Sequence, residues 1–258
     1  MKKSNFALYS RLGEDFWYIQ ARRDLLKKIL TRTFGKRKNL KILDAGCGTG
    51  FNFAALSEFG AVYGVDLNKL AIAQAKSFKY KKLHLGDVNS LKYRDYFDVI
   101  VAIELIEHIR DDSGTLKNFC RYLKPGGILI LTAPAFKFLW SADDDLAMHE
   151  RRYSKKRLRD ILRTSGLKLV FLTYRYFFQF FPASSVFFLQ KFHKPKNSLE
   201  YTPKFLNRFL VWITRLENSL IQNGFVFPFG VGFFLIAKKP TQIRRFRGGL
   251  TESNKYAS

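Results

Sequence analysis

The sequence predicts an α/β fold built on a mainly parallel sheet. Short apolar runs of strand length alternate along the chain with longer segments of helical periodicity, which is the pattern of βαβ units. The first apolar run is also followed by closely spaced glycines, in the stretch ILDAGCGTGFNFAAL (residues 42–56). Such a stretch is typical of a strand that turns tightly into a helix and lets a ligand approach the backbone.

The elements follow in order from the spacing of apolar residues. The first helix is predicted over 14–34 and the first strand over 40–44. Strands are then predicted at 62–65, 82–85, 97–103 and 128–132, and helices at 54–59, 70–78, 116–123 and 155–165. Pro125-Gly126-Gly127 ends the third of these helices, whereas the last begins after the cap residue Ser154 and ends at Gly166.

The chain is strongly basic, with a formal net charge of +24 in 258 residues. Charge of this size predicts an anionic partner: nucleic acid, an acidic lipid surface or a phosphorylated metabolite. The alternative is a lysine-rich surface that is simply solvated. Because 47% of the residues are hydrophobic, we expect a packed core in one large domain, with or without an elaboration.

The cysteines and the first residues of the chain indicate the cellular compartment that we expect for the protein. Cys47 and Cys120 have no metal-type spacing, so a disulfide framework is not expected. The residues after Met1 lack the apolar core of a signal peptide. We therefore expect a cytoplasmic protein.

The glycine-rich turn admits two cofactor interpretations. A dinucleotide site requires G-x-G-x-x-G, but counting from Gly46 places Phe51 at the last glycine, where a bulky ring would block close helix–strand packing. The observed pattern is D-x-G-x-G-x-G, beginning at Asp44. A carboxylate there suits a ligand with an ammonium group better than a pyrophosphate, which it would repel.

Acidic residues also end the next two predicted strands. Asp66 stands where a carboxylate can bind both hydroxyls of a ribose, and Asp87 suits the edge of an adenine. Each acid alone could be a helix cap or a turn residue. Three acids at successive strand ends, beginning with Asp44, favour a nucleoside ligand instead.

Five stretches together carry a family resemblance. ILDAGCGTG, VYGVDLN, LHLGDV, FDVIVAIELIEHI and YLKPGGILILTAP, in this order, resemble the class I S-adenosylmethionine (SAM)-dependent methyltransferases over residues 39–170. The resemblance implies a Rossmann-like, doubly wound, seven-stranded sheet whose last strand, at Gly230–Lys239, is antiparallel. It also implies a helical insertion between strands six and seven.

The resemblance assigns cofactor contacts to individual residues. It implies that the three glycines of the turn line the methionine part of SAM, that Asp66 binds the ribose, and that Leu67 packs on the adenine. It places Asp87 and Val88 at the adenine ring. The full set assigned to the cofactor is Asp44, Gly46, Cys47, Gly48, Gly50, Asp66, Leu67, Asp87, Val88 and Glu104.

A narrower likeness extends outside this core. DFWYIQARRDLLKKIL and LWSADDDLAMHERRYSKKRLRDIL resemble a bacterial and archaeal subgroup often associated with polysaccharide or prenyl-lipid pathways. It implies a small or lipid-linked acceptor. In the first stretch, Trp17, Arg22 and Arg23 form either a lid over the cofactor or part of an ordinary packing helix.

The residues after the fourth strand concern the reaction. Enzymes that methylate exocyclic amines of bases resemble an Asn/Asp-Pro-Pro-aromatic motif at this point. This chain has Ala-Ile-Glu-Leu instead, which argues against that reaction. On a helix, Glu104, Glu107 and His108 would share one face. Similar E-x-x-E-H segments in ubiquinone-pathway and small-RNA O-methyltransferases bind a divalent metal, so this set is a candidate Mg²⁺ site that would polarise a hydroxyl. Alternatively, Glu107 caps or pairs locally and His108 packs under the cofactor.

A second catalytic candidate is His149, in HERRYS. Its imidazole could take the proton of an acceptor hydroxyl. The neighbouring Arg151 and Arg152 could bind phosphate or carboxylate, and an acid within Asp143–Asp145 could orient the histidine. The alternative is that this segment is the exposed start of a helix, with Tyr153 as a hydrophobic staple.

The chain divides into an N-terminal helical segment (1–38), a methyltransferase domain (39–240) and a basic, disordered tail (241–258). Within the domain, residues 175–229 form an aromatic, basic helical insertion. The stretch Tyr174–Pro195 is too interrupted to span a membrane and suits an interfacial segment on anionic lipid. Lys204–Ile221 is predicted as an amphipathic helix. The insertion could instead be a cap over the acceptor site.

Three functions remain open at this stage. The favoured one is O-methylation of a small or lipid-linked metabolite by an enzyme peripheral to the inner face of the membrane. The second is an RNA 2′-O-methyltransferase, although the aromatic residues do not alternate as stacking platforms and nucleic acid is the less favoured partner. The third is a non-catalytic SAM-binding protein.

Overall fold

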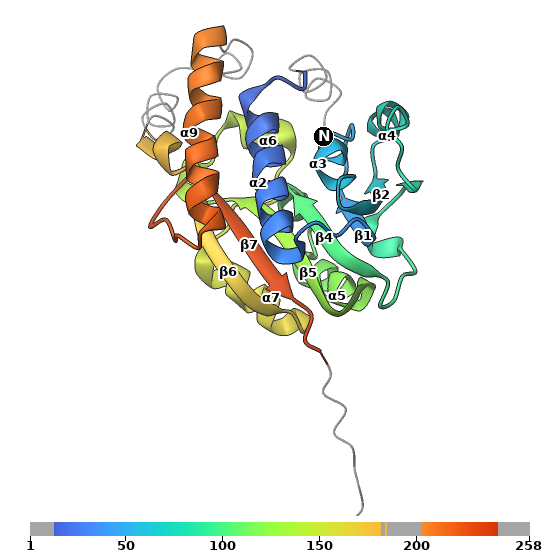
Figure 1. Cartoon of the computed structure of the whole chain (residues 1–258). Helices are drawn as coiled ribbons and strands as arrows, with labels where there is room; N and C mark the ends of the chain where they lie inside the picture. Colours follow the sequence, from blue (N-terminus) through green and yellow to red (C-terminus); the bar gives the residue numbers. More distant parts are fainter. Residues whose placement is uncertain (1–12, 182–183, 185–202, 242–258) are drawn as a thin grey trace, which may run out of the picture.

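The computed structural model describes residues 13–181, 184 and 203–241, and it contains one seven-stranded sheet (Figure 1). The strands are β1 (Leu40–Ala45), β2 (Gly60–Asp66), β3 (Lys82–Leu85), β4 (Phe97–Ile103), β5 (Leu123–Pro134), β6 (Lys168–Arg175) and β7 (Gly232–Lys238). The α-helices are α2 (Trp17–Phe34), α3 (Phe53–Leu56), α4 (Lys69–Ala75), α5 (Asp112–Tyr122), α6 (Ala142–Ala147), α7 (Lys155–Ser165) and α9 (Lys204–Gln222). Short 3₁₀ helices are η1 (Val88–Ser90), η2 (Ile106–His108), η3 (Lys137–Leu139) and η4 (Phe177–Gln179).

The strand order is β3-β2-β1-β4-β5-β7-β6. The first five strands pair in parallel, whereas β7 lies between β5 and β6 and is antiparallel to both. The predicted mainly parallel sheet with an antiparallel last strand is therefore confirmed. Because the order reverses between β1 and β4, the carboxyl ends of these strands leave a crevice, where open α/β sheets bind ligands.

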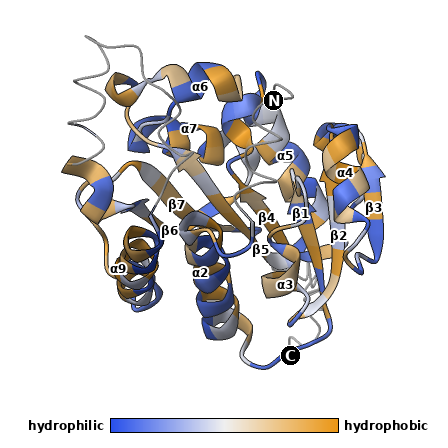
Figure 2. Cartoon of the chain, turned by 90° about the horizontal axis from the view of Figure 1, so that it is seen from above, coloured by the Kyte–Doolittle hydropathy of each residue, from blue (hydrophilic) through white to orange (hydrophobic). Residues whose placement is uncertain are grey.

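Helices cover both faces of the sheet (Figure 2). Helices α5 and α7 pack together on one face, and α2 and α9 pack together on the other. The central strands are buried from both sides, and Val99, Ile100 and Val101 of β4 are completely inaccessible to solvent. Burial on both faces explains why these strands are continuous apolar runs.

Helix α9 is fastened to the start of α2 by side chains. Asn207 Oδ1 accepts a hydrogen bond from the Trp17 backbone N–H at 2.8 Å, and Asn218 Nδ2 donates to the Ala21 carbonyl at 2.8 Å. The predicted helix over 204–221 is thus confirmed, and its position beside α2 is a tertiary feature. None of the described helices combines the length and apolarity needed to span a bilayer.

Some boundaries differ from the prediction. Helix α5 begins at Asp112, because the Asp111 side chain caps it by accepting the Gly114 N–H. Strand β5 begins at Leu123, which pairs with Phe97 before an irregularity around Pro125–Gly127. The tail 242–258 lies outside the described residues. The same holds for the aromatic stretch from 182 to 195, except for position 184.

Candidate active site

A cleft of about 900 Å³ opens at the carboxyl edge of the sheet. Its walls come from the glycine turn after β1, the ends of β2 and β4, helix α6 and the first turns of α2. Most of the predicted site residues line it, namely Gly46, Cys47, Gly48, Asp66, Leu67, Asp87, Val88, Glu104, His108 and His149. The lining as a whole runs from Phe16 to Gly232, so residues far apart in the sequence meet in one cavity.

The glycine turn has the backbone geometry expected for a ligand-binding loop. Gly46 and Gly48 have φ values of 68° and 55°, in the left-handed region that favours glycine. A Cβ at Gly46 would also lie 2.8 Å from a Leu105 methyl carbon. Asp66 Oδ2 accepts the Gly48 N–H at 2.9 Å and ties the turn to the end of β2. Gly50 does not line the cleft, and a Cβ there would meet the Phe78 ring at 2.7 Å.

Asp44 lies under this turn and does not line the cleft. Its carboxylate accepts hydrogen bonds from Asn52 Nδ2 at 3.1 Å and from the Tyr80 hydroxyl at 2.9 Å. Burial raises the pKa of Asp44 to about 6, although both hydrogen bonds act in the opposite direction. The position of Asp44 is that of a support for the turn.

Residues that follow β2 and β3 also line the cleft. Leu67 follows β2 and is 73% exposed, as expected for a side chain that would pack on a planar ring. Val88 is buried and also lines the cleft. Asp87 is exposed, and its carboxylate accepts the Asn89 N–H at 2.8 Å, which is the capping alternative raised from the sequence.

The E-x-x-E-H segment is not arranged as the sequence predicts. It forms the short 3₁₀ helix η2, and Glu104 precedes it with a φ of 48°. Glu104 Oε1 instead accepts a hydrogen bond from the Thr132 hydroxyl at 2.8 Å. Because the chain leaves β4 in this strained turn, Glu104, Glu107 and His108 do not occupy one face of a continuous helix.

The structure groups a different set of potential ligands. Ligand atoms of Glu107, His108 and His149 all lie within 4.8 Å of one another. Glu107 is completely buried, and neither of its carboxylate oxygens has a hydrogen-bond partner among the described residues. Burial, followed by the nearby charge of Glu104, raises the Glu107 pKa well above its usual value. Burial and the adjacent His149 lower the pKa of His108 to about 4, so this imidazole is neutral near pH 7.

His149 is held by a buried carboxylate. Its Nδ1 lies 2.8 Å from Asp144 Oδ1, and the rings of His149 and His108 are 4.7 Å apart. Asp144 belongs to α6, where it forms a capping box with Ser141. Burial alone would raise the pKa of Asp144, but the hydrogen bonds from His149 and Arg152 lower it to about 2. Of the three acids considered from the sequence, Asp144 is thus the one that orients the histidine.

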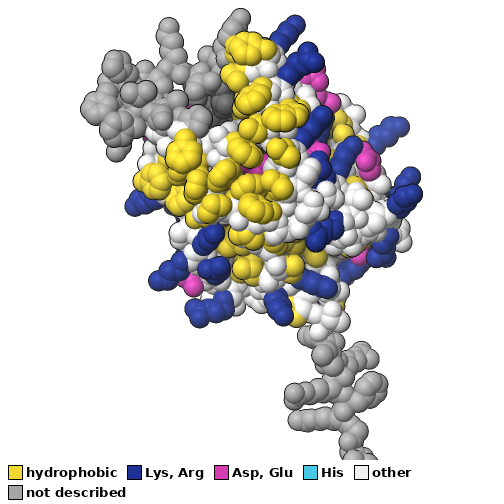
Figure 3. Space-filling view, turned by 60° about the vertical axis from the view of Figure 1, so that its left-hand side comes forward, with side chains coloured by type: hydrophobic (Ala, Val, Ile, Leu, Met, Phe, Trp, Pro, Cys, Tyr) yellow, Lys and Arg dark blue, Asp and Glu magenta, His cyan; other side chains and the backbone are white. Residues whose placement is uncertain are grey.

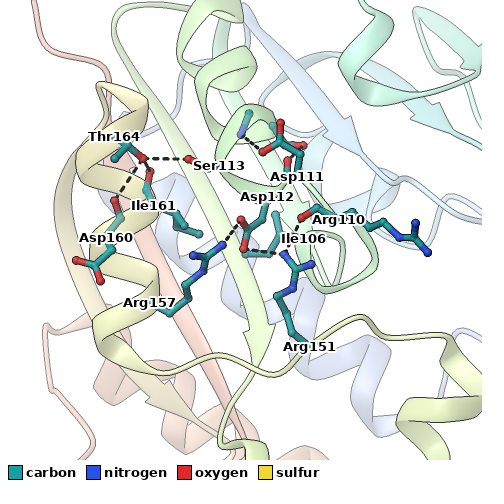
Figure 4. Close-up of polar contacts among 12 residues, drawn as sticks. Ile106, Arg110, Asp111, Asp112, Ser113, Arg151, Arg157, Asp160, Ile161 and Thr164 are labelled. Carbon is teal, nitrogen blue, oxygen red and sulfur yellow. Dashed lines mark hydrogen bonds and ion pairs between the residues drawn. The ribbon is translucent and has the colours of Figure 1, made fainter.

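The two arginines beside His149 have internal partners. Arg152 binds both oxygens of Asp144, each at 2.9 Å, and the carbonyl of Ala135. Arg151 pairs with the buried Asp112 at 3.1 Å and donates to the Arg110 carbonyl, as Figure 4 shows. The interpretation of these arginines as anion-binding residues is therefore not supported, because their charges already neutralise buried acids.

Tyr176, which sequence reasoning missed, completes the cleft. It lines the cleft beside Trp17 and Tyr18, and its ring stacks on Tyr18 at 5.5 Å. Its hydroxyl is buried and has no hydrogen-bond partner in the described structure, and burial raises its pKa to about 12. Tyr176 has a left-handed φ of 58°. Buried Glu217 of α9 stabilises this conformation by accepting the Tyr176 and Phe177 N–H groups at 2.6 and 2.8 Å.

A weak sequence signal for this arrangement exists. Glu217 is the only acidic residue in α9, so a buried role could be suspected from its isolation. Nothing in the local sequence indicates the unusual conformation of Tyr176. Of the residues considered as a lid, Trp17 and Arg22 line the cleft, whereas Arg23 binds the Phe51 carbonyl at 2.6 Å.

Comparison with known proteins addresses the central part of the chain. Residues 43–131, which contain the glycine turn, Asp66, Asp87 and the E-x-x-E-H segment, match the family model described as "Methyltransferase domain". These residues are therefore similar to a methyltransferase domain. The match covers β2, β3 and β4, half of β1 and most of β5, and it leaves α2, α6, α9 and β7 outside it.

Curated relatives of this chain carry one recurring name. The chain is 31% identical over 143 residues to the ubiquinone biosynthesis O-methyltransferase of Coxiella burnetii, covering 50% of this chain and 61% of the relative. It is 37% identical over 100 residues to the protein of the same name from Bradyrhizobium diazoefficiens, covering 36% and 39%. The matched stretch therefore spans about 60% or less of these relatives.

Solved structures show the same fold at lower identity. Phosphoethanolamine N-methyltransferase 2 of Haemonchus contortus, in complex with SAM, superposes with a TM-score of 0.60 and 19% identity, covering 93% of this chain and 58% of that chain. The [4+2]-cyclase SpnF gives a TM-score of 0.54 at 18% identity, covering 84% and 82%. Because a cyclase shares the architecture, the fold alone does not determine the reaction.

Proposed function

We propose that this chain is a SAM-dependent methyltransferase that methylates a hydroxyl group of a small or lipid-linked metabolite at a membrane surface. The observation that carries the proposal is the His149–Asp144 pair, which faces the same cleft as the glycine turn and Asp66. A ligand held by the turn would bring its reactive group toward this histidine. The relatives named O-methyltransferases support oxygen as the methylated atom.

The residues of the cleft have distinct tasks in this proposal. SAM, when bound, supplies an electrophilic methyl group on its sulfonium. The glycine turn at Gly46 and Gly48 lines its methionine part, Asp66 binds its ribose, and Leu67 packs on its adenine. His149 Nε2 accepts the proton of the acceptor hydroxyl, while Asp144 keeps the proton on Nδ1 and stabilises the resulting imidazolium. The aromatic side chains Trp17, Tyr18 and Tyr176 position the acceptor and exclude water.

A divalent cation is a second candidate role for the same cluster. Glu107, His108 and His149 would hold it, and the unpaired oxygens of Glu107 are the observation that favours it. Two imidazoles and one carboxylate suit Zn²⁺ or another transition metal better than the Mg²⁺ suggested by the sequence, because Mg²⁺ prefers oxygen ligands. The Nε2 lone pair of His149 cannot both bind a cation and accept a proton, so the two roles exclude each other.

Removal of metal distinguishes these roles. If His149 is the general base, dialysis against a chelator leaves turnover unchanged. If the cluster holds a cation, turnover falls after dialysis and is restored by Mn²⁺ or Zn²⁺ more than by Mg²⁺. In that case Glu107→Ala abolishes the response, whereas Asp95→Ala, an exposed acid outside the cleft, retains it.

The proposed activity is tested with labelled cofactor. Purified protein is incubated with SAM carrying a radioactive methyl group and, in separate reactions, with a polar-lipid extract, an aqueous metabolite extract and RNA. We expect S-adenosylhomocysteine to form and label to appear in a lipid or small-molecule product. Label in RNA would support the 2′-O-methyltransferase alternative, and SAM binding without turnover on any extract would support a non-catalytic protein.

A further inference from the structure

Helix α9 has a continuous apolar strip on its outer side. Phe205, Phe209, Trp212 and Leu216 are spaced by four, three and four residues and therefore share one face of the helix. They are 76%, 52%, 61% and 45% exposed, respectively. This strip is separate from the side that α9 buries against the domain, where the inaccessible residues are Val211, Thr214, Glu217, Asn218 and Ile221.

Exposed hydrophobic side chains also occur beyond the helix. Phe225 and Val226 in the following loop are 50% and 51% exposed, and Phe181 is 65% exposed. Figure 3 brings this side of the molecule forward and shows hydrophobic side chains gathered in one broad area, with Lys and Arg side chains around it. Contiguous exposed aromatic residues on this scale mark an interaction surface.

The charges on α9 indicate the chemistry of the partner. Lys204, Arg208 and Arg215 are exposed and lie along one flank of the strip. Glu217, the only acidic residue of the helix, is 1% exposed, so α9 presents no negative charge to the outside. A helix with an aromatic, apolar outer face and cationic residues beside it is the composition of an interfacial helix on anionic lipid.

We propose that the outer face of α9 docks on the interface of an anionic lipid bilayer. The aromatic strip inserts among the lipid headgroups and upper acyl chains, and the three cationic side chains contact lipid phosphates. A second copy of this chain is a poorer occupant, because a symmetric pair would bring two sets of these cations together. An anionic bilayer neutralises these cations, whereas in a dimer the two sets would repel each other.

The location of the helix connects this surface to the cleft. Asn207 of α9 binds the backbone of Trp17, which lines the cleft, and Glu217 binds the backbone of Tyr176, which also lines it. Helix α9 therefore lies between a bilayer on its outer face and the proposed acceptor pocket. The inference deepens the proposed function, on which its acceptor side rests, because docking would hold the enzyme on the surface that contains a lipid-linked acceptor.

Vesicle co-sedimentation of the full chain tests the docking surface. The vesicles are phosphatidylcholine alone or phosphatidylcholine with phosphatidylglycerol. The apolar variant is Phe209→Ser/Trp212→Ser, the charge variant is Arg208→Gln/Arg215→Gln, and the control is Leu70→Ser, which removes a 49% exposed leucine from α4 near the opposite edge of the sheet. Circular dichroism confirms that each variant is folded.

On anionic vesicles, we expect the apolar variant to lower the vesicle partition coefficient by a factor of about ten or more. The charge variant should lower it by roughly tenfold on anionic vesicles and leave any binding to neutral vesicles unchanged. The control should bind as the wild type does. Absence of wild-type binding at low salt, or wild-type binding by the apolar variant, would overturn the proposal.

Light scattering tests a second copy of this chain as the occupant. A wild-type dimer that the apolar variant dissociates would show that a second copy covers the strip and would overturn the lipid proposal. Calorimetric titration of the same samples with SAM separates the two proposals. Vesicle binding without SAM binding contradicts the proposed function alone, and SAM binding without vesicle binding contradicts the docking surface alone.

Discussion

The two halves of the cleft are built in different ways. The half formed by β1, β2 and the start of η1 consists of residues close together in sequence, and Gly48 is held by Asp66 only 18 positions away. The other half brings together Trp17, His149 and Tyr176, which belong to distant segments. The first half can therefore be predicted from sequence motifs, whereas the second depends on how α2, α6 and α9 pack. Mutations in the two halves should accordingly have separable effects.

The largest expected effect is on turnover in the second half. His149→Ala should lower kcat by about 10²–10⁴-fold, because the acceptor proton loses its base, while the dissociation constant for SAM stays unchanged. Asp144→Asn should lower kcat by a smaller factor, since it misorients the ring. His84→Ala, a histidine on β3 outside the cleft, is the control. Wild-type turnover by His149→Ala would exclude it as the base.

The next effect concerns the first half alone. Asp66→Ala should weaken SAM binding by at least about 100-fold, because it removes both the proposed ribose ligand and the anchor of the Gly48 N–H. Isothermal titration calorimetry measures this change, with Asp95→Ala as the matched control. Unchanged affinity in Asp66→Ala would mean that the nucleoside lies elsewhere.

Glu217 tests whether α9 shapes the second half. Glu217→Ala leaves the buried Tyr176 N–H and the Phe177 N–H without an acceptor, which should cost about 2–4 kcal/mol of unfolding free energy in urea titrations. Glu217→Gln should recover part of this loss because one amide oxygen remains. Ser219→Ala on the same helix should cost little. Equal stability of Glu217→Ala and Ser219→Ala would show that Tyr176 does not depend on α9.

The smallest effect is a pH dependence in the first half. The folded pKa of Asp44 is about 6, above its ordinary value of 3.8, so the folded state binds this proton more tightly than the unfolded state does. The corresponding stability, at most about 3 kcal/mol, is fully present below pH 4 and is lost as the pH rises through 6. In Asp44→Asn, which cannot ionise, the thermal unfolding midpoint should fall less between pH 4 and pH 7 than it does in the wild type. Asp95→Asn should keep the wild-type profile, and two identical profiles would contradict the assignment.

Prediction from the sequence succeeded where one segment contains both partners of an interaction. The conformation of the glycine turn and the cap at Ser154 are local patterns that appear as expected. Of the acids at successive strand ends, Asp66 and Asp87 line the cleft, whereas Asp44 does not. The metal-ligand prediction changed because helical spacing was assumed for residues that form a strained turn and one 3₁₀ helix. Arg151 and Arg152 form ion pairs with Asp112 and Asp144, which only the packing of the chain brings to them, so their predicted anion-binding role gains no support.

The sequence by itself determined the parallel sheet with its antiparallel last strand and the backbone of the glycine turn in the cleft. Apolar periodicity and turn chemistry act over a few residues, so they can be read without coordinates. Only the tertiary structure decided that Glu107, His108 and His149 meet, that Glu217 fixes Tyr176, and that an aromatic face of α9 points outward. These features depend on which surfaces distant helices bury, and many arrangements of those helices are compatible with the same local patterns.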